Sequence, residues 1–213
     1  MKTFQKLASV GVAVTALLIA SAQPAHAHIT VVFDSVTPSG TDWQWNYEAQ
    51  LGGNERVDST GPSPFGSLTV SPQGQPYSNN ADFFTIYDFN GYVAGSVFAP
   101  AGWSAQVQAV GPTPSEMSIP DSSTVNLLFV YTGATPIISP PGVNITGFGA
   151  LSITGLDSIG SYASQVTTTG GAVADLNDDS NGPVPTPGAV PEPASMLLLG
   201  TGLLGVARLR RRK

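Results

Sequence analysis

The sequence predicts an all-β fold, an antiparallel β-sandwich or jelly-roll-like body, with an N-terminal signal helix and a short C-terminal transmembrane helix. The first indication is a period of two in the body. In the run TDWQWNYEAQ, Trp43, Trp45 and Tyr47 fall on one face and polar residues on the other. The second indication is the series of Gly, Pro, Asn and Ser clusters that separate short aromatic and β-branched runs. The body shows no helical apolar stripe.

The expected strands follow one another between turn signals such as STGPSPFG and ISPPG. They are ITVVFDSV, TDWQWNYEAQ, DFFTIYDF, GSVF, WSAQVQAV, VNLLFVYT and GFGALSIT. We expect one domain over residues 28–175. The chain has no cysteine, so a hydrophobic core must hold this domain together, and about 150 residues are enough to form one.

Residues 1–27 have the three parts of a secretory signal peptide. Lys2 and Lys6 form a basic start, a short apolar run follows, and Ala25-His26-Ala27 provides an A-x-A cleavage site. We expect cleavage after Ala27, so that the mature chain begins at His28, with a cut after Ala22 as the minor alternative.

Residues 176–189 are rich in Pro, Gly and acidic side chains and show no apolar periodicity. Because proline favours extended, non-helical backbone, we expect a solvated linker here. It would separate the body from the C-terminal segment.

A calcium site is a weaker interpretation of the same region. Asp175, Asn177 and Asp179 stand at alternate positions, as in an EF-hand loop. The EF-hand pattern then requires Gly and Glu where this chain has Ser180 and Thr186. We therefore expect no metal site, with these three residues as weak calcium candidates.

The C-terminal segment, residues 190–213, has three parts. Pro191-Glu192-Pro193 is followed by the apolar stretch 194–207 and then by a basic cluster. The apolar stretch would reach about 21 Å as a helix, less than the ~30 Å of a bilayer core, so it is a marginal span. Positive residues at both ends of the chain favour cytoplasmic termini and an exported body. The cluster consists of Arg208, Arg210, Arg211, Arg212 and Lys213.

This tripartite arrangement resembles the PEP-CTERM protein-sorting signal of Gram-negative bacteria. The resemblance implies recognition by exosortase, a multi-spanning membrane cysteine peptidase, and cleavage near Pro191 to Pro193. It further implies transient anchoring in the inner membrane, a final place at the cell surface or in the extracellular matrix, and association with exopolysaccharide and biofilm. The alternative is a plain C-terminal anchor that persists.

The exported part is strongly acidic. From His28 to Glu192 it holds all 14 acidic residues and one base, Arg56, which leaves 13 net negative charges. Binding to nucleic acid or to an anionic membrane surface requires Lys and Arg to neutralise phosphates. We therefore expect no nucleic-acid partner.

Composition also limits the chemistry. The exported part has no Cys or Lys, and after signal cleavage its one histidine is His28. This excludes a Ser-His-Asp triad, a Cys-His pair, a Schiff-base lysine and a multi-histidine zinc site. We expect no catalytic residues, no cofactor and no enzymatic activity.

Two alternatives to a non-enzymatic surface or matrix protein stay open. One is a carbohydrate-binding module with exposed aromatic side chains, and the other is a carboxylate-based glycoside hydrolase. At alternating strand positions aromatic residues usually belong to the core, and the exposure of the tryptophans separates the possibilities. The aromatic candidates are Trp43, Trp45, Tyr47, Tyr87, Tyr92 and Trp103.

Overall fold

A computed structural model shows an all-β protein, as the sequence predicts. It describes residues 28–61, 80–114, 119, 124–139, 142–169 and 176–189. Within these residues there are ten strands and no helix. The expected signal helix (1–27) and transmembrane helix (190–213) lie outside the described residues. The strands are β1 (Ile29–Ser39), β2 (Asp42–Leu51), β3 (Glu55–Val57), β4 (Phe83–Ile86), β5 (Trp103–Gln108), β6 (Asn126–Tyr131), β7 (Ile137–Ser139), β8 (Val143–Ser152), β9 (Asp157–Thr168) and β10 (Asn177–Pro187).

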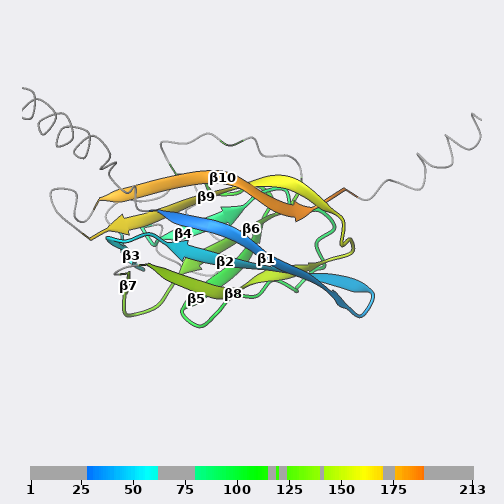
Figure 1. Ribbon diagram of the computed structural model, residues 1–213, viewed down its shortest axis with the longest axis horizontal. Helices are drawn as coiled ribbons and strands as arrows, with labels where there is room; N and C mark the ends of the chain where they lie inside the picture. Colours follow the sequence, from blue (N-terminus) through cyan, green and yellow to red (C-terminus); the bar gives the residue numbers. More distant parts are fainter. Residues whose placement is uncertain are drawn as a thin grey trace, which may run out of the picture.

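The strands form two antiparallel sheets (Figure 1). The smaller sheet has the order β1-β2-β8. The larger follows the order β5-β6-β4-β9-β3-β7, and β10 pairs with β9 outside this path. β9 is the longest strand and joins β4, β3 and β10. The larger sheet is therefore organised around it.

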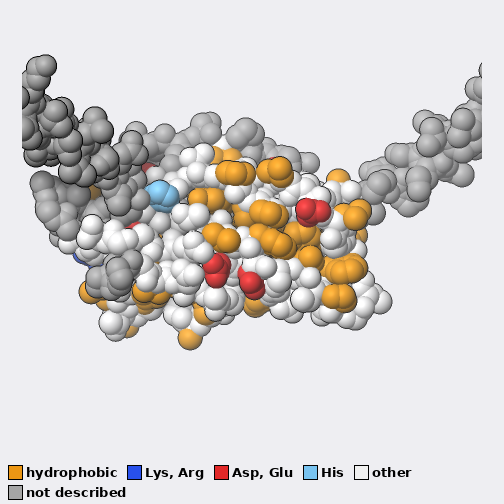
Figure 2. All heavy atoms as spheres, in the orientation of Figure 1, with side chains coloured by type: hydrophobic (Ala, Val, Ile, Leu, Met, Phe, Trp, Pro, Cys, Tyr) orange, Lys and Arg blue, Asp and Glu red, His pale blue; other side chains and the backbone are white. Residues whose placement is uncertain are grey.

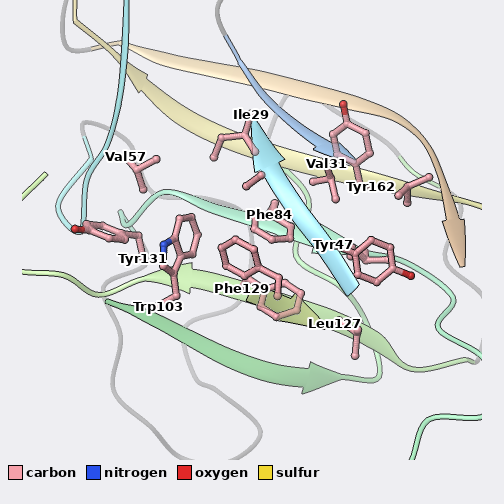
Figure 3. Packing of buried hydrophobic residues seen from close by; sticks show 14 of the residues in the cluster. Ile29, Val31, Tyr47, Val57, Phe84, Trp103, Leu127, Phe129, Tyr131 and Tyr162 are labelled. Carbon is pink, nitrogen blue, oxygen red and sulfur yellow. The ribbon is translucent and has the colours of Figure 1, made fainter. Parts of the chain in front are cut away.

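Aromatic rings join the two sheets in one core. Phe148 of β8 lies 4.9 Å from the ring centre of Phe84 on β4, 5.2 Å from that of Phe129 on β6 and 5.0 Å from that of Trp103 on β5. Figure 3 shows the latter three rings side by side, with Tyr131 next to the tryptophan. Packing of two antiparallel sheets through shared rings agrees with the expected sandwich.

The alternation expected of the second strand is present in β2. Trp45, Tyr47, Ala49 and Leu51 are buried in the core. Strand β4 differs, because all four of its residues are buried. One of its faces belongs to the main core and the other to a second, smaller cluster. That smaller cluster consists of Ala81, Phe83, Leu128 and Val130.

One expected strand is not a strand. In the run GSVF, Phe98 forms a single bridge with Gly149 of β8. Conversely, β3, β7, β9 and β10 were not expected from the alternation of residues. β9 lacks a simple period because its first residues are exposed and its last seven are all buried.

The prediction that residues 176–189 form a linker is wrong. Residues Asn177–Pro187 form β10, which pairs with β9 at every position from Asn177↔Thr167 to Pro187↔Asp157. Val184 and Thr186 are buried, each with about 1% exposure, so this strand contributes to the body. Three prolines occupy alternate positions, 183, 185 and 187. Since proline has no N–H to donate, such a row suits a strand with a ladder partner on one side.

Candidate functional site

The end of β10 determines where the chain leaves the body. The Gly188 amide donates a hydrogen bond of 2.6 Å to the Leu156 carbonyl. The Asn90 side-chain amide donates one of 3.0 Å to the Pro187 carbonyl. The body therefore holds the chain up to Gly188. Pro191, the first residue of the expected sorting motif, stands three residues further on, which spans at most about 10 Å.

Most residues expected at the sorting and processing sites lie outside the described residues. These are the Pro191-Glu192-Pro193 motif, the basic cluster of residues 208–213, and Ala25 and Ala27. His28 is described and directly precedes β1, with partial exposure. A cut after Ala27 would therefore leave β1 complete.

The calcium candidates do not lie on a loop. Asn177 and Asp179 are residues of β10, opposite Thr167 and Gln165 of β9, whereas Asp175 lies outside the described residues. Among the residues that the structure describes, no group of three or more His, Cys, Asp or Glu side chains could hold a metal ion.

Two acidic side chains are fully buried near β3, a feature that the sequence pattern does not reveal. Glu55 and Asp82 both have 0% exposure. The Asp82 carboxylate accepts hydrogen bonds from the Asp58 amide (2.7 Å) and from the Thr167 hydroxyl (3.0 Å). The Oε2 atom of Glu55 accepts a hydrogen bond of 2.9 Å from the Gly52 amide, whereas its Oε1 atom has no hydrogen-bond partner among the described residues.

Burial changes the acidity of both groups. Desolvation raises the pKa of Glu55 from 4.5 to about 8, with a further contribution from the negative charges of Asp178 and Asp82. Desolvation likewise raises the pKa of Asp82 from 3.8 to about 7. For Asp58, partial burial is outweighed by hydrogen bonds from Thr60 and by Arg56, so its pKa lies below the usual value. Near neutral pH Glu55 therefore largely retains its proton, whereas Asp82 is protonated only in part.

The aromatic side chains belong to the core rather than to an open surface. Trp45, Tyr47 and Tyr87 have at most 1% exposure, and Trp103 has 8%. Polar atoms of two of these side chains form hydrogen bonds within the body. The Trp45 indole donates to the Thr154 carbonyl at 3.0 Å, and the Tyr47 hydroxyl donates to the Pro185 carbonyl at 3.0 Å. The two remaining candidates, Trp43 and Tyr92, are half-buried.

The face of β2 that points away from the core carries a polar row. Gln44, Asn46, Glu48 and Gln50 alternate with the buried residues and are half-buried. The Gln44 amide donates to the Asn46 oxygen at 2.8 Å. The Asn46 amide donates to the Ser35 hydroxyl of β1 at 3.2 Å. The smaller sheet thus presents an ordered row of amide and carboxylate groups.

Among the described residues, no helix has the length and apolar character needed to cross a membrane. The span expected in residues 194–207 is not among them.

A cysteine-free β body that ends three residues before a Pro-Glu-Pro motif, an apolar stretch and a basic cluster has the organisation of a sorted, exported protein. The family model of the PEP-CTERM protein-sorting motif matches residues 189–213. The C-terminal region therefore carries this motif, as the resemblance implied, and the motif supports export, transient membrane anchoring and processing by exosortase. No curated protein and no solved structure matches the chain.

Proposed function

We propose that the body is a non-enzymatic surface or extracellular-matrix protein, which exosortase releases from the membrane and which then associates with exopolysaccharide. The observation that carries this proposal is the sorting motif, because it begins directly after a folded, acidic β body. The signal peptide at residues 1–27 would supply export, and the body would be the part that remains outside.

The burial of the unusual acids argues against a glycoside hydrolase. Raised carboxyl pKa values are typical of catalytic acids, but a catalytic acid must reach the glycosidic oxygen. Glu55 and Asp82 are closed off from solvent. Their protonation therefore serves the packing of the body in this proposal.

The positions of the aromatic residues argue against sugar binding on an aromatic platform. A platform needs ring faces open to solvent, and the largest rings pack against one another instead. The polar row of β2 fits a hydrated polymer better, because amide groups both donate to and accept from hydroxyl groups. We therefore place the polymer contact on Gln44, Asn46 and Gln50.

The test is binding of the mature protein, recovered from the surface of producing cells, to exopolysaccharide from the same cells. We expect the double variant Gln44→Ala/Asn46→Ala to bind about tenfold more weakly, since it loses several polar contacts. The matched control replaces two exposed polar residues outside the smaller sheet, Thr132→Ala/Asn181→Ala. It should bind like the wild type.

Three results would contradict the proposal. The first is the absence of binding by the wild-type protein, and the second is an equal loss of binding in the control variant. The third is release of new reducing ends from the polymer by the wild-type protein, which would support the hydrolase alternative.

A further inference from the structure

Exposed apolar side chains gather where the chain leaves the body. Six large hydrophobic residues of the described part are more than half exposed, and three of them fall in one stretch of seven residues. Ile153 is 57% exposed, Leu156 63% and Ile159 85%. We call these three residues the exit patch. Figure 2 shows hydrophobic side chains at the end of the molecule where β10 ends.

The backbone of the exit patch is fixed to the body. The Ile153 amide donates to the Gly91 carbonyl at 2.9 Å, and the Leu156 amide donates to the Thr154 hydroxyl at 3.1 Å. Ile159 lies within β9, opposite Pro185 of β10. The patch is thus a preformed surface, which lowers the entropic cost of binding a partner.

The exit patch and the sorting motif are close along the chain. Leu156 itself accepts the hydrogen bond from Gly188, the last residue held by the body. Pro191 follows three residues later, so the motif starts at most about 10 Å from this anchor. A peptidase that binds Pro191 to Pro193 in an active-site cleft must therefore also meet this end of the body.

The charge of the body disfavours a lipid bilayer as the partner of the patch. Peripheral binding to anionic lipid combines apolar burial with Lys and Arg side chains. The exported part has a single base, Arg56, whose position on β3 is opposite Thr167, at the far end of β9 from Asp157. Asp157 itself is exposed next to the patch. A protein surface can cover three aliphatic side chains without the electrostatic attraction that lipid binding requires.

We propose that the exit patch is a docking surface for the membrane peptidase that processes the sorting motif, a second contact beyond the motif itself. Its partner is an apolar region beside the active-site cleft of that peptidase, without acidic groups opposite Asp157. The two contacts act together because the short connection keeps both at high local concentration. This inference rests on the sorting motif and is independent of polymer binding.

The test is a pulse–chase measurement of processing of the full-length protein in the producing cells. The variant Ile153→Thr/Leu156→Thr/Ile159→Thr should be processed about tenfold more slowly, since it loses three buried aliphatic contacts. The matched control removes the other three exposed hydrophobic residues, Val110→Thr/Ile138→Thr/Leu176→Thr. It should be processed at the wild-type rate.

A second variant keeps the test valid if the patch substitutions affect folding. A flexible Gly/Ser spacer of about 30 residues after Ala189 separates the patch from the motif and lowers their mutual local concentration. In this background the patch substitutions should slow processing by less than about twofold. An undiminished effect there would show that the substitutions act on folding or export, and would overturn the proposal.

Three further results would overturn it. These are wild-type processing of the patch variant, equal slowing of the control, and no processing of the wild-type chain. Patch-dependent sedimentation of the released protein with phosphatidylethanolamine and phosphatidylglycerol vesicles would also overturn it, in favour of a lipid contact.

Discussion

The Thr167 hydroxyl of β9 donates a hydrogen bond of 3.0 Å to the carboxylate of Asp82, the residue directly before β4. This bond lies in the interior, because neither side chain has any exposed surface. It connects two neighbouring strands of the larger sheet at the end where β3 also joins β9. Glu55 of β3 is near enough for the negative charge of Asp82 to raise the pKa of Glu55 further. The stability of this end of the body should therefore depend on pH.

We predict that the melting temperature falls as the pH rises from about 5 to about 8.5. Unfolded Asp and Glu lose their protons at their ordinary pKa values, 3.8 and 4.5, whereas folded Asp82 and Glu55 keep theirs up to about 7 and 8. Between these pKa values the folded state binds more protons than the unfolded state, so raising the pH lowers the free energy of unfolding. The pKa of Asp58 is lowered in the folded state, so this group changes the free energy of unfolding only at pH values below this range. Calorimetry across the range measures the effect.

The control for this prediction is Glu55→Gln. The glutamine side chain is neutral at every pH and can still accept the hydrogen bond from Gly52. We expect it to raise the melting temperature at about pH 8.5 by a few degrees and to flatten the pH dependence. A melting temperature that rises with pH, or an unchanged slope in the variant, would contradict the assignment.

The close pairing of β2 with β8 predicts a strong effect of substituting Gly149, which lies opposite Asn46. A Cβ atom there would collide with the carbonyl oxygen of Trp45 and lie 2.7 Å from the Phe98 ring. Gly149→Ala should therefore lower the free energy of unfolding by about 2–3 kcal/mol, as overpacking does elsewhere. Gly53→Ala is the matched control, since nothing lies within 4 Å of its added Cβ. Urea unfolding compares the two, and equal stabilities would refute the close strand contact.

The burial of the tryptophans predicts weak fluorescence quenching. Trp45 has no exposed surface and Trp103 has 8%, while Trp43 is half-buried. Acrylamide should quench mainly Trp43, so Trp43→Phe should remove most of the quenchable signal. Strong quenching that persists in this variant would mean that core tryptophans are open to solvent, and would restore the aromatic sugar platform as a hypothesis.

The sequence predicted the all-β fold correctly because the β2 pattern is governed by local burial. Trp45 and Tyr47 must face the core, and their polar neighbours must not. The prediction from sequence was wrong at β10, where Pro183, Pro185 and Pro187 suggest an extended linker. Their alternate spacing also fits a strand with one ladder partner, and this was the signal available.

The buried acids could not have been predicted from the sequence. Glu55 and Asp82 are 27 positions apart, and a carboxylate in a short polar run is usually solvated. Their burial depends on β3 and β4 both joining β9. The exit patch could not have been predicted from the sequence either, because the exposure of Ile159 depends on which face of β9 the rest of the body covers.

Calcium should stabilise the body only slightly. Asn177 and Asp179 are positions of a regular strand, so they do not wrap around an ion as a loop does. We expect millimolar calcium to raise the melting temperature by less than about 2 °C. A larger increase that disappears in Asp179→Ala would establish a calcium site here.

The most direct test of the sorting account is the intact mass of the protein recovered from the surface or the medium of producing cells. We predict a chain that begins at His28 and ends close to Pro191, as expected from a signal-peptide cut after Ala27 and removal of the C-terminal segment by exosortase. Replacing Pro191, Glu192 and Pro193 with alanine should leave the full C-terminal segment attached and retain the protein in the inner membrane. A mature surface protein whose mass still includes Lys213 would show that the segment is a permanent anchor, and would contradict the account.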